Sequence, residues 1–386
     1  MPQSRIRVAV IVETSRGHGR AIVAGVSRYA AEHPAWSLRL EPRNIDDRPP
    51  AWLRSWAGDG ILVRCDSAAM ARATRATGVP VIDVRGGVPE AGLPLVGVDN
   101  VPVADLAFEH FRERGFRHFA WCDLFSLGRP WMHIRRDRFL ARARQAGASA
   151  HCFQARRSTR VASQKHEAVT DLLEWLGGLP RPVAILACDD EQAHLVLDAV
   201  LTLGILVPND MAVLGIDNDD VFCRASSPSL SSVDVNADTV GYEAAATLAT
   251  RMQGRRVPAR RYLPPRGVVA RRSTDIVAVE SADAAAALRL IRERGCEGLT
   301  ADDAAAALAV SRSTLDRLLH AAVGQTATSA IMQVRLARVK ADLAETDLPL
   351  KSIARRAGFT SVQHLANLFR SREGLTPGRY RRAMRP

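Results

Sequence analysis

The sequence places charged and hydrogen-bonding side chains directly after several segments that have the pattern of buried strands. These segments are short apolar runs rich in β-branched residues, such as 7–12, 81–84, 183–188 and 211–216. In an open parallel sheet, ligands bind beyond the carboxyl ends of the strands, so side chains at these ends are candidates to meet one ligand. The candidates are Arg16, His18, Arg85, Asp189, Asp217 and Asn218.

The residue types in this set favour a neutral, hydroxyl-rich ligand. Carboxylates accept hydrogen bonds from hydroxyl groups, and arginine forks donate to hydroxyl oxygens. A mixture of acidic and basic groups suits a polyol better than a phosphate. Trp131 and Phe222 are candidates to pack against the apolar face of a sugar ring. For any single residue the alternative is a structural salt bridge in a loop, but the cluster as a whole favours a binding site.

A second constellation lies near the end of the chain, where two segments share one layout. Residues 302–319 and 350–370 each contain a short helical pattern, a tight turn and a serine placed to cap a second helix. Ser311 and Ser361 suit these caps because a hydroxyl oxygen can accept from the unpaired amides of a helix start. Gly358 permits a left-handed turn, and the small Ala354 permits a close helix crossing. The layout predicts two helix-turn-helix units, near 302–320 and 350–371.

The second helix of such a unit enters the major groove of DNA and presents its first turns to the base edges. Arginine matches guanine, and glutamine or asparagine matches adenine. The outward-facing candidates are Arg312, Ser313, Thr314, Asp316 and Arg317 in the first unit, and Val362, Gln363, His364, Asn367 and Arg370 in the second. Arg379, Arg381 and Arg382 follow the second recognition helix and are expected to meet phosphates. The alternative, two helical hairpins with solvated faces, is disfavoured by the occurrence of two copies.

The charge distribution agrees with a polyanionic partner. The formal net charge is +12. Residues 284–386 contain 17 Lys and Arg against 9 Asp and Glu, whereas the rest of the chain contains 36 against 32. A basic C-terminal region is typical of proteins that bind double-stranded DNA, although a solvated arginine-rich surface would have the same charge.

The elements that must position these residues fall into two parts. Up to residue 275, strand-like runs alternate with helical segments, which predicts a two-lobed, doubly wound α/β domain with about nine strands. Residues 276–283 have the character of a linker. From Ala284 onward the pattern is helical throughout, which predicts a separate all-α DNA-binding domain over 284–386.

Several classes of protein are disfavoured. The sequence lacks the common nucleotide-binding, zinc-protease and serine-hydrolase motifs, so we expect no enzyme and no catalytic residues. No spacing of Cys and His is typical of a metal site, and we expect no cofactor. No apolar run approaches a bilayer-spanning length, and the first residues lack a signal peptide pattern, so we expect a cytoplasmic protein without a membrane partner.

The last hundred residues resemble the AraC/XylS family of transcription regulators. The match is carried by Ile353-Ala354, Gly358-Phe359, Ser361, Phe369-Arg370 and the run from Gly374 through Thr376-Pro377 to Tyr380-Arg381. By this resemblance, the helix connecting the two units is expected to begin at Arg335-Leu336. His364 and Leu365 stand where the family usually has an aromatic pair, which puts the base preference in doubt.

The first 275 residues resemble the periplasmic-binding-protein-like sensor domain of LacI-type repressors. The matching fragments include Val98-Asp99-Asn100, Asp189-Asp190-Glu191, Gly215-Ile216-Asp217-Asn218 and Arg272-Ser273-Thr274. The resemblance implies a small sugar effector, with a pentose such as xylose favoured, and adds Arg135 to the ligand site. Asp189 replaces the common Asn and Val235 stands where many relatives have Gln, which leaves the identity of the sugar open.

Together the two resemblances imply a sugar-responsive transcription regulator that acts as a homodimer on a double-stranded operator. The AraC-type half favours an activator of a sugar catabolic operon, with RNA polymerase as a further partner. Two alternatives stay open: a repressor that responds to a different polyol, and a solute-binding receptor of a transport system. The receptor would require an export signal and would have no use for a basic C-terminal domain.

Overall fold

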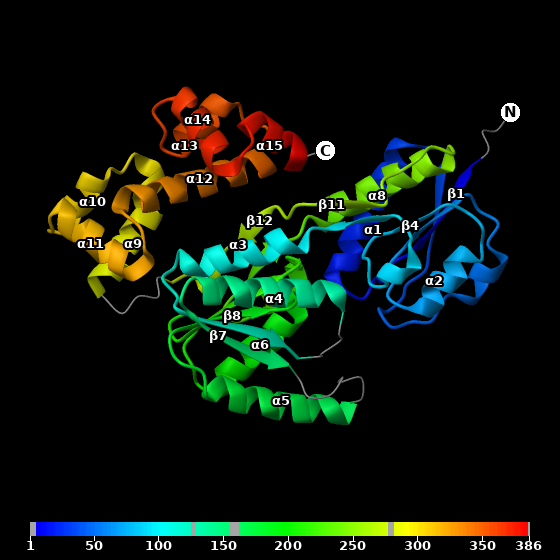
Figure 1. Cartoon of the computed structure of the whole chain (residues 1–386), viewed down its shortest axis with the longest axis horizontal. Coiled ribbons are helices and arrows are strands. Elements are labelled where there is room, and N and C mark those ends of the chain that lie inside the picture. Colours follow the sequence, from blue (N-terminus) through cyan, green and yellow to red (C-terminus); the bar gives the residue numbers. More distant parts are fainter. Residues whose placement is uncertain (1–4, 125–128, 155–161, 277–281, 385–386) are drawn as a thin grey trace.

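The computed structural model describes residues 5–124, 129–154, 162–276 and 282–384. The chain alternates between two α/β lobes and ends in a helical domain (Figure 1). Among the described residues, no helix has the length and apolar character that crossing a bilayer requires. Most of the expected linker, residues 277–281, lies outside the described residues.

The first lobe is built on a six-stranded sheet whose neighbouring strands all run parallel. Its four central strands have mostly buried side chains, as expected for a sheet covered on both faces. In spatial order the strands are β11 (Arg260–Leu263), β5 (Leu95–Val98), β4 (Val81–Asp83), β3 (Gly60–Val63), β1 (Ile6–Ile11) and β2 (Trp36–Leu40).

The second lobe repeats this plan with one antiparallel edge. Strand β12 runs antiparallel to β10, and the other neighbours are parallel. In spatial order the strands are β12 (Gly267–Val269), β10 (Ser231–Asp234), β9 (Met211–Ile216), β8 (Val183–Ala187), β6 (His118–Asp123) and β7 (Ser149–Gln154). The chain passes between the lobes after β5, after β10 and between β11 and β12, so three crossings join them.

Helices cover both faces of each sheet, as Figure 1 shows. They are α1 (Gly17–Glu32), α2 (Ala68–Arg75), α3 (Asn100–Arg112), α4 (Pro130–Gln145), α5 (Ala162–Gly177), α6 (Asp190–Thr202), α7 (Asp220–Ala225) and α8 (Ala237–Met252). Short 3-10 turns complete this part of the chain at Ala51–Ser55, Pro89–Ala91 and Arg272–Thr274. The predicted two-lobed, doubly wound architecture is confirmed.

The number of strands was underestimated. The described residues contain twelve, and the sequence patterns did not pick out β2, β7, β10, β11 and β12. These strands are short or lie at or near a sheet edge, and the residues of β2 and β12 are not fully buried. A half-exposed strand of three to five residues lacks the continuous apolar run that marks the central strands.

The described residues of the C-terminal domain form helices joined by turns and contain no strand, as predicted. Its helices are α9 (Ala282–Arg294), α10 (Ala301–Ala307), α11 (Arg312–Val323), α12 (Ala327–Glu345), α13 (Leu350–Arg356), α14 (Val362–Glu373) and α15 (Pro377–Met384), with a 3-10 turn at Gly295–Glu297. Figure 1 shows α12 running between two helical subdomains. The first half of α12 contributes Ala330 and Ile331 to one buried cluster, and the second half contributes Val339 and Leu343 to the other.

One sequence expectation about α12 is wrong. The helix begins at Ala327 and not at Arg335, because Thr326 caps it by accepting from the amide of Ser329. Arg335 lies in the middle of the helix and joins the subdomains instead. Its Nε and Nη2 donate to the carbonyls of Gly295 and Leu299, each at 2.8 Å.

Gly358 ends α13 in the left-handed region, with φ at +77°, as its place in the turn predicted. A Cβ atom at this position would lie 2.7 Å from the carbonyl oxygen of Cys296. Gly374, which ends α14 with φ at +72°, has open space around the same position. The two glycines therefore share a backbone conformation and differ in how closely another segment approaches.

This difference makes the pair a matched test. Gly374→Ala should cost about 1–2 kcal/mol of stability because an L-residue is strained in the left-handed conformation. Gly358→Ala should cost about 1–3 kcal/mol more, because the Cys296 backbone must move. Native-state hydrogen exchange of the α13 and α14 amides measures the local opening free energy in the full chain. Equal losses for the two variants would contradict the close approach at Gly358.

Candidate ligand cleft and nucleic-acid interface

The carboxyl ends of strands from both lobes direct polar side chains into one region between the lobes. Glu13 and Arg64 follow β1 and β3, and Arg85 follows β4 in the first lobe. Asp189 and Asp217 follow β8 and β9 in the second lobe. Salt bridges and hydrogen bonds connect residues of the two lobes here, as described below. The fold therefore brings most of the predicted ligand residues together at the carboxyl ends of the strands.

A chain of three polar side chains, with the buried His18 in the middle, connects Arg85 to Asp217. Arg85 Nη1 lies 2.9 Å from His18 Nε2, and His18 Nδ1 lies 3.4 Å from Asp217 Oδ1. Burial, with Arg85 adding to it, lowers the pKa of His18, so the ring is neutral. Because a neutral ring accepts from Arg85 through Nε2, its proton is on Nδ1. The contact of Nδ1 with Asp217 Oδ1 lacks hydrogen-bond geometry, so neither atom has a hydrogen-bond partner among the described residues.

Asp217 is held as a carboxylate in this environment. Burial raises its pKa, but His18, Arg135 and Arg85 together outweigh burial and hold the pKa well below the usual range. Its backbone lies at φ +109°, a strained conformation for a residue with a side chain. The strain directs a charged group into the cleft directly after β9.

Arg135, in the first turns of α4, is completely buried. Its Nε donates to Asn100 Oδ1 at 2.8 Å, and Nη1 lies 3.4 Å from the carbonyl oxygen of Cys188. Burial lowers its pKa, and the nearby carboxylate of Asp217 opposes this effect. The guanidinium is therefore held through Nε and Nη1. Its Nη2 atom has no hydrogen-bond partner among the described residues.

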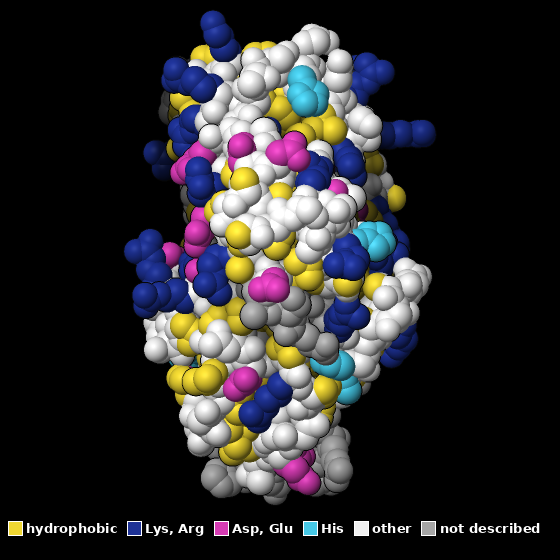
Figure 2. All heavy atoms as spheres, turned by 90° about the vertical axis from the view of Figure 1, so that its left-hand side faces the viewer, with side chains coloured by type: hydrophobic (Ala, Val, Ile, Leu, Met, Phe, Trp, Pro, Cys, Tyr) yellow, Lys and Arg dark blue, Asp and Glu magenta, His cyan; other side chains and the backbone are white. Residues whose placement is uncertain are grey.

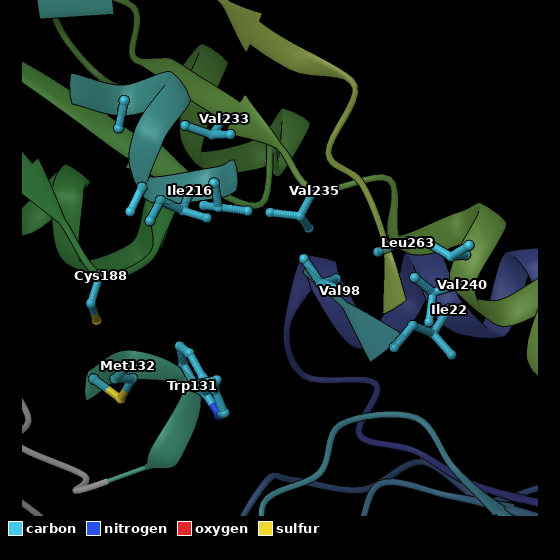
Figure 3. Close-up of a cluster of buried hydrophobic side chains, with 14 of the residues drawn as sticks. Ile22, Val98, Trp131, Met132, Cys188, Ile216, Val233, Val235, Val240 and Leu263 are labelled. Atoms are coloured by element: carbon cyan, nitrogen blue, oxygen red, sulfur yellow. The ribbon is translucent and has the colours of Figure 1, made fainter. Parts of the chain in front are cut away.

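Trp131 forms an aromatic wall of the same cleft. The guanidinium carbons of Arg85 and Arg135 lie 3.9 Å and 4.9 Å from the centre of its ring. Figure 3 shows Trp131 at the start of α4, in the space between Cys188 of the second lobe and Val98 of the first. Because these two guanidinium groups already lie over the buried ring, packing of Trp131 against a sugar ring stays a prediction.

Five buried polar atoms of this cluster have no hydrogen-bond partner among the described residues. Four are nitrogen atoms, and one is a carboxylate oxygen. They are His18 Nδ1, Arg85 Nε, Trp131 Nε1, Arg135 Nη2 and Asp217 Oδ1. Buried polar groups are nearly always hydrogen-bonded, and leaving one unsatisfied costs about 1–3 kcal/mol. The arrangement can therefore bind a ligand that accepts several hydrogen bonds and donates at least one.

Arg16 and Asp189 close one side of the cleft. Arg16 Nη1 lies 3.2 Å from Asp189 Oδ2, and Arg16 Nη2 lies 3.5 Å from Glu191 Oε2. Burial lowers the pKa of Arg16, but these two carboxylates outweigh it and the pKa is raised. Asp189 also caps α6, because its Oδ1 accepts from the amide of Gln192. The pair thus links the first lobe to the second.

Two further predicted ligand residues, Asn218 and Phe222, have contacts within the protein. Asn218 Oδ1 accepts from Arg271 Nη2 at 2.9 Å, and the Asn218 amide donates to Ser232 Oγ. The ring of Phe222 lies 5.8 Å from that of His194. A direct ligand contact for Asn218 stays a prediction, and its described contacts explain its place in the fold without one.

The sequence analysis missed five residues of the cleft: Glu13, Arg64, Asp66, Asn100 and Arg129. Arg64 is buried and bonds to Glu13 and Asp66. Burial lowers the pKa of Arg64, but the two carboxylates outweigh it and raise the pKa. Glu13 and Arg64 stand directly after apolar strands, so the rule that selected Arg85 would also have selected them.

The first helix-turn-helix unit is confirmed as α10 and α11. Ser311 caps α11 by accepting from the amide of Thr314. Ser313 and Arg317 are exposed on this helix. Arg312 is held by Asp302 at 3.2 Å and Asp316 at 3.1 Å, so it must exchange protein contacts to reach a base.

The second unit, α13 and α14, is also confirmed. Ser361 caps α14 by accepting from the amide of His364. Gln363, His364, Asn367 and Arg370 are exposed along one helix. Gln363 Nε2 donates to Asn367 Oδ1 at 3.2 Å, so the two amides form one hydrogen-bonding surface. Leu365, by contrast, is completely buried in the subdomain core.

Arg381 was predicted to contact phosphate. Its Nη2 donates to the carbonyl of Leu348 at 2.5 Å, and the side chain is half-buried against the preceding loop. Arg379 and Arg382 are exposed. The phosphate role of Arg381 stays a prediction, and the contact with Leu348 gives this residue a second, structural role.

Basic side chains lie on the outside of this domain. Figure 2 views the side of the molecule that carries α10 and α11 and shows Lys and Arg projecting at the outline of its upper part. Acidic and apolar side chains lie between them. On this face the basic side chains therefore do not form one continuous patch.

Comparisons with known proteins agree with both halves of this description. Residues 108–274 match the periplasmic binding protein-like domain, and residues 304–383 match a helix-turn-helix domain. The xylose operon regulatory protein of Escherichia coli K12 is 29% identical over 98% of this chain and 97% of its own length. That of Haemophilus influenzae is 27% identical, with 99% of each chain covered.

Solved structures show the same arrangement. The xylose-binding transcription activator XylR is 27% identical, with 99% of each chain covered and a TM-score of 0.63. A cellobiose complex of the regulator CelR is 22% identical and covers 71% of this chain with a TM-score of 0.57, which supports the fold of the two lobes. This chain therefore combines a periplasmic binding protein-like domain with a helix-turn-helix domain, and it is a DNA-binding transcription regulator that is similar over nearly its whole length to the xylose operon regulatory proteins.

Proposed function

We propose that this chain senses a neutral sugar, D-xylose in the first place, and activates transcription of an operon for its catabolism. The full-length similarity to xylose operon regulatory proteins supports the choice of sugar. The charge balance of the cleft supports a neutral ligand, because arginines and carboxylates occur there together. The proposal assigns no catalytic step to the chain.

The observation that carries the proposal is the set of five unsatisfied polar atoms around Trp131. A pyranose has hydroxyl groups on its edge and an apolar face, so it can satisfy donors and acceptors while its face packs on the indole. The atoms come from both lobes: His18 and Arg85 belong to the first, and Arg135 and Asp217 to the second. A bound sugar would therefore hold the lobes together.

Coupling to DNA requires that the sugar favour one arrangement of the domains over another. Hydrogen bonds join the second lobe to the C-terminal domain, so they would change if this lobe moved. Glu113, at the end of α3, accepts from Gln333 of α12, and Arg117 donates to the carbonyl of Ala321 in α11. Because both contacts start from the second lobe, a movement of this lobe would reach both subdomains through α11 and α12.

Several further parts of the proposal concern organisation and partners. We expect a homodimer acting in the cytoplasm, since paired operator sites favour two-fold symmetry, and RNA polymerase as the partner of an activator. We place the sensor domain at 1–275, the linker at 276–283 and the DNA-binding domain at 284–386. A repressor would use the same site. A transport receptor is disfavoured because it would have no use for α11 and α14.

The sugar site is tested by removing the single unsatisfied acceptor. Asp217→Ala should weaken D-xylose binding by at least about tenfold, because a buried hydroxyl loses its partner and the arginines lose their counter-charge. Asp220→Ala, which removes an exposed carboxylate on the same segment, should leave the affinity unchanged. Isothermal titration calorimetry measures both. Unchanged xylose affinity in Asp217→Ala would remove Asp217 from the site.

The DNA surface is tested by two exposed residues with different expected roles. Gln363→Ala should relax the preference at one or two base pairs, because a base-edge contact discriminates by about 1–3 kcal/mol. Arg379→Ala should weaken specific and random DNA alike and reduce the salt slope by about one. Binding assays over a series of salt concentrations separate the two effects. If Gln363→Ala weakened all sequences equally, its assignment to a base edge would fail.

A further inference from the structure

A cavity lies beside the proposed sugar site and has no function assigned above. Its volume is about 200 Å³. This is several times the share of one water molecule, roughly 30 Å³. It lies beyond the ends of β1 and β3, and the residues that matter here are Glu13, Arg43, Arg64, Asp66 and Arg129, with Asn44 at its rim.

We propose that this cavity is a second sugar subsite, so that the preferred effector is a disaccharide or glycoside larger than a free pentose. The inference rests on the proposed function, because it extends the same sugar site. The proposed class of effector is a neutral saccharide whose first ring packs on Trp131 and whose second ring or substituent occupies the cavity.

The two compartments share their walls. Arg129 and Trp131 stand two residues apart at the start of α4, one in each compartment. On the first lobe, Glu13 lines the cavity and Arg16 and His18 follow it on the same segment. Arg64 lies between them, since it bonds to Glu13 and Asp66 and is close enough to Asp217 for its pKa to be affected. A ligand that reached from Trp131 into the cavity would pass Arg64.

The cavity also contains unsatisfied polar atoms of its own. Glu13 Oε2, Asp66 Oδ1 and Arg129 Nε are buried and have no hydrogen-bond partner among the described residues. Glu13 is 2% exposed, so water from the surface does not readily satisfy its second oxygen. These two acceptors and one donor belong to residues that line the cavity, and the hydroxyl groups of a further sugar unit could satisfy them.

The charges around the cavity argue against an acidic ligand. Arg43, Arg64 and Arg129 stand beside the carboxylates of Glu13, Asp46, Asp47 and Asp66. Arg64 is already neutralised by Glu13 and Asp66, and Arg129 lies 3.2 Å from Asp46. A phosphate or uronate would meet at least as much negative as positive charge, whereas a neutral polyol meets donors and acceptors of both kinds.

Occupation of the cavity would also affect closure of the lobes. Arg129 belongs to the second lobe and donates to the carbonyl of Asp66 in the first at 2.7 Å. With the Asp46 contact, it forms a bridge directly over the cavity. A second sugar unit that accepts from Arg129 Nε would add a link across the same gap. A larger effector would thus favour the closed arrangement more than a monosaccharide does.

The test compares each monosaccharide with its own β-1,4-linked dimer on the full chain. D-xylose is paired with xylobiose, and D-glucose with cellobiose, and calorimetry measures each affinity. At least one disaccharide should bind about tenfold or more tightly than its monosaccharide, since further buried hydrogen bonds form. Weaker binding of both disaccharides than of their monosaccharides would overturn the subsite.

Two variants of Asn44, an exposed residue at the rim, test whether the higher affinity for the disaccharide arises in this cavity. Asn44→Trp fills the mouth of the cavity and should remove the advantage of the disaccharide, while monosaccharide affinity stays within about twofold and shows that the variant is folded. Asn44→Ala keeps the cavity open and should keep the advantage. An equal loss for both sugars in Asn44→Trp, or an advantage that survives it, would overturn the proposal. If none of the four sugars bound, the sugar-sensor proposal itself would fail, and the subsite with it.

Discussion

Arg135 is buried and Asp217 largely buried between the two lobes, and each keeps one polar atom that no described residue satisfies. The sensor domain depends on this constraint, because an ion removed from water is tolerated only with partners around it. The protein supplies part of the compensation: Asn100 and Cys188 hold Arg135, and His18 faces Asp217. The remaining donors and acceptor are available for a ligand, which gives the closed arrangement of the lobes a free-energy advantage when a sugar is bound.

The sheets position this cluster, and the C-terminal domain connects it to DNA. Parallel strands bring their carboxyl ends to one edge of each sheet, and three crossings of the chain hold the two edges against each other. The C-terminal domain contains two copies of a helix-turn-helix unit, each with a tight turn followed by a serine-capped helix. Helix α12 connects the two copies. Arg335 and the close approach at Gly358 fix the subdomains to each other, so the spacing of the recognition helices is a property of the domain.

Much of this was predictable from local sequence patterns. The central strands, the two capped units and the cluster of Arg85, Asp189 and Asp217 follow from periodicity, capping and the strand-end rule. The edge strands β2 and β12 were missed because a short, half-exposed strand lacks a continuous apolar run. Asn218 was included because it follows a strand, although its side chain turns to Arg271. No local pattern reveals that Arg381 turns inward to Leu348, since this depends on tertiary packing.

The central claim is that occupation of the cleft and binding of DNA are linked in one molecule. The most direct test selects DNA sites from a random pool with the full chain and measures their affinity with and without saturating sugar. The sugar should change the DNA affinity by a factor of about 5–150, and DNA should change the sugar affinity by the same factor, because the coupling free energy is reciprocal. If the sugar bound and the DNA affinity were the same with and without it, the account would be contradicted.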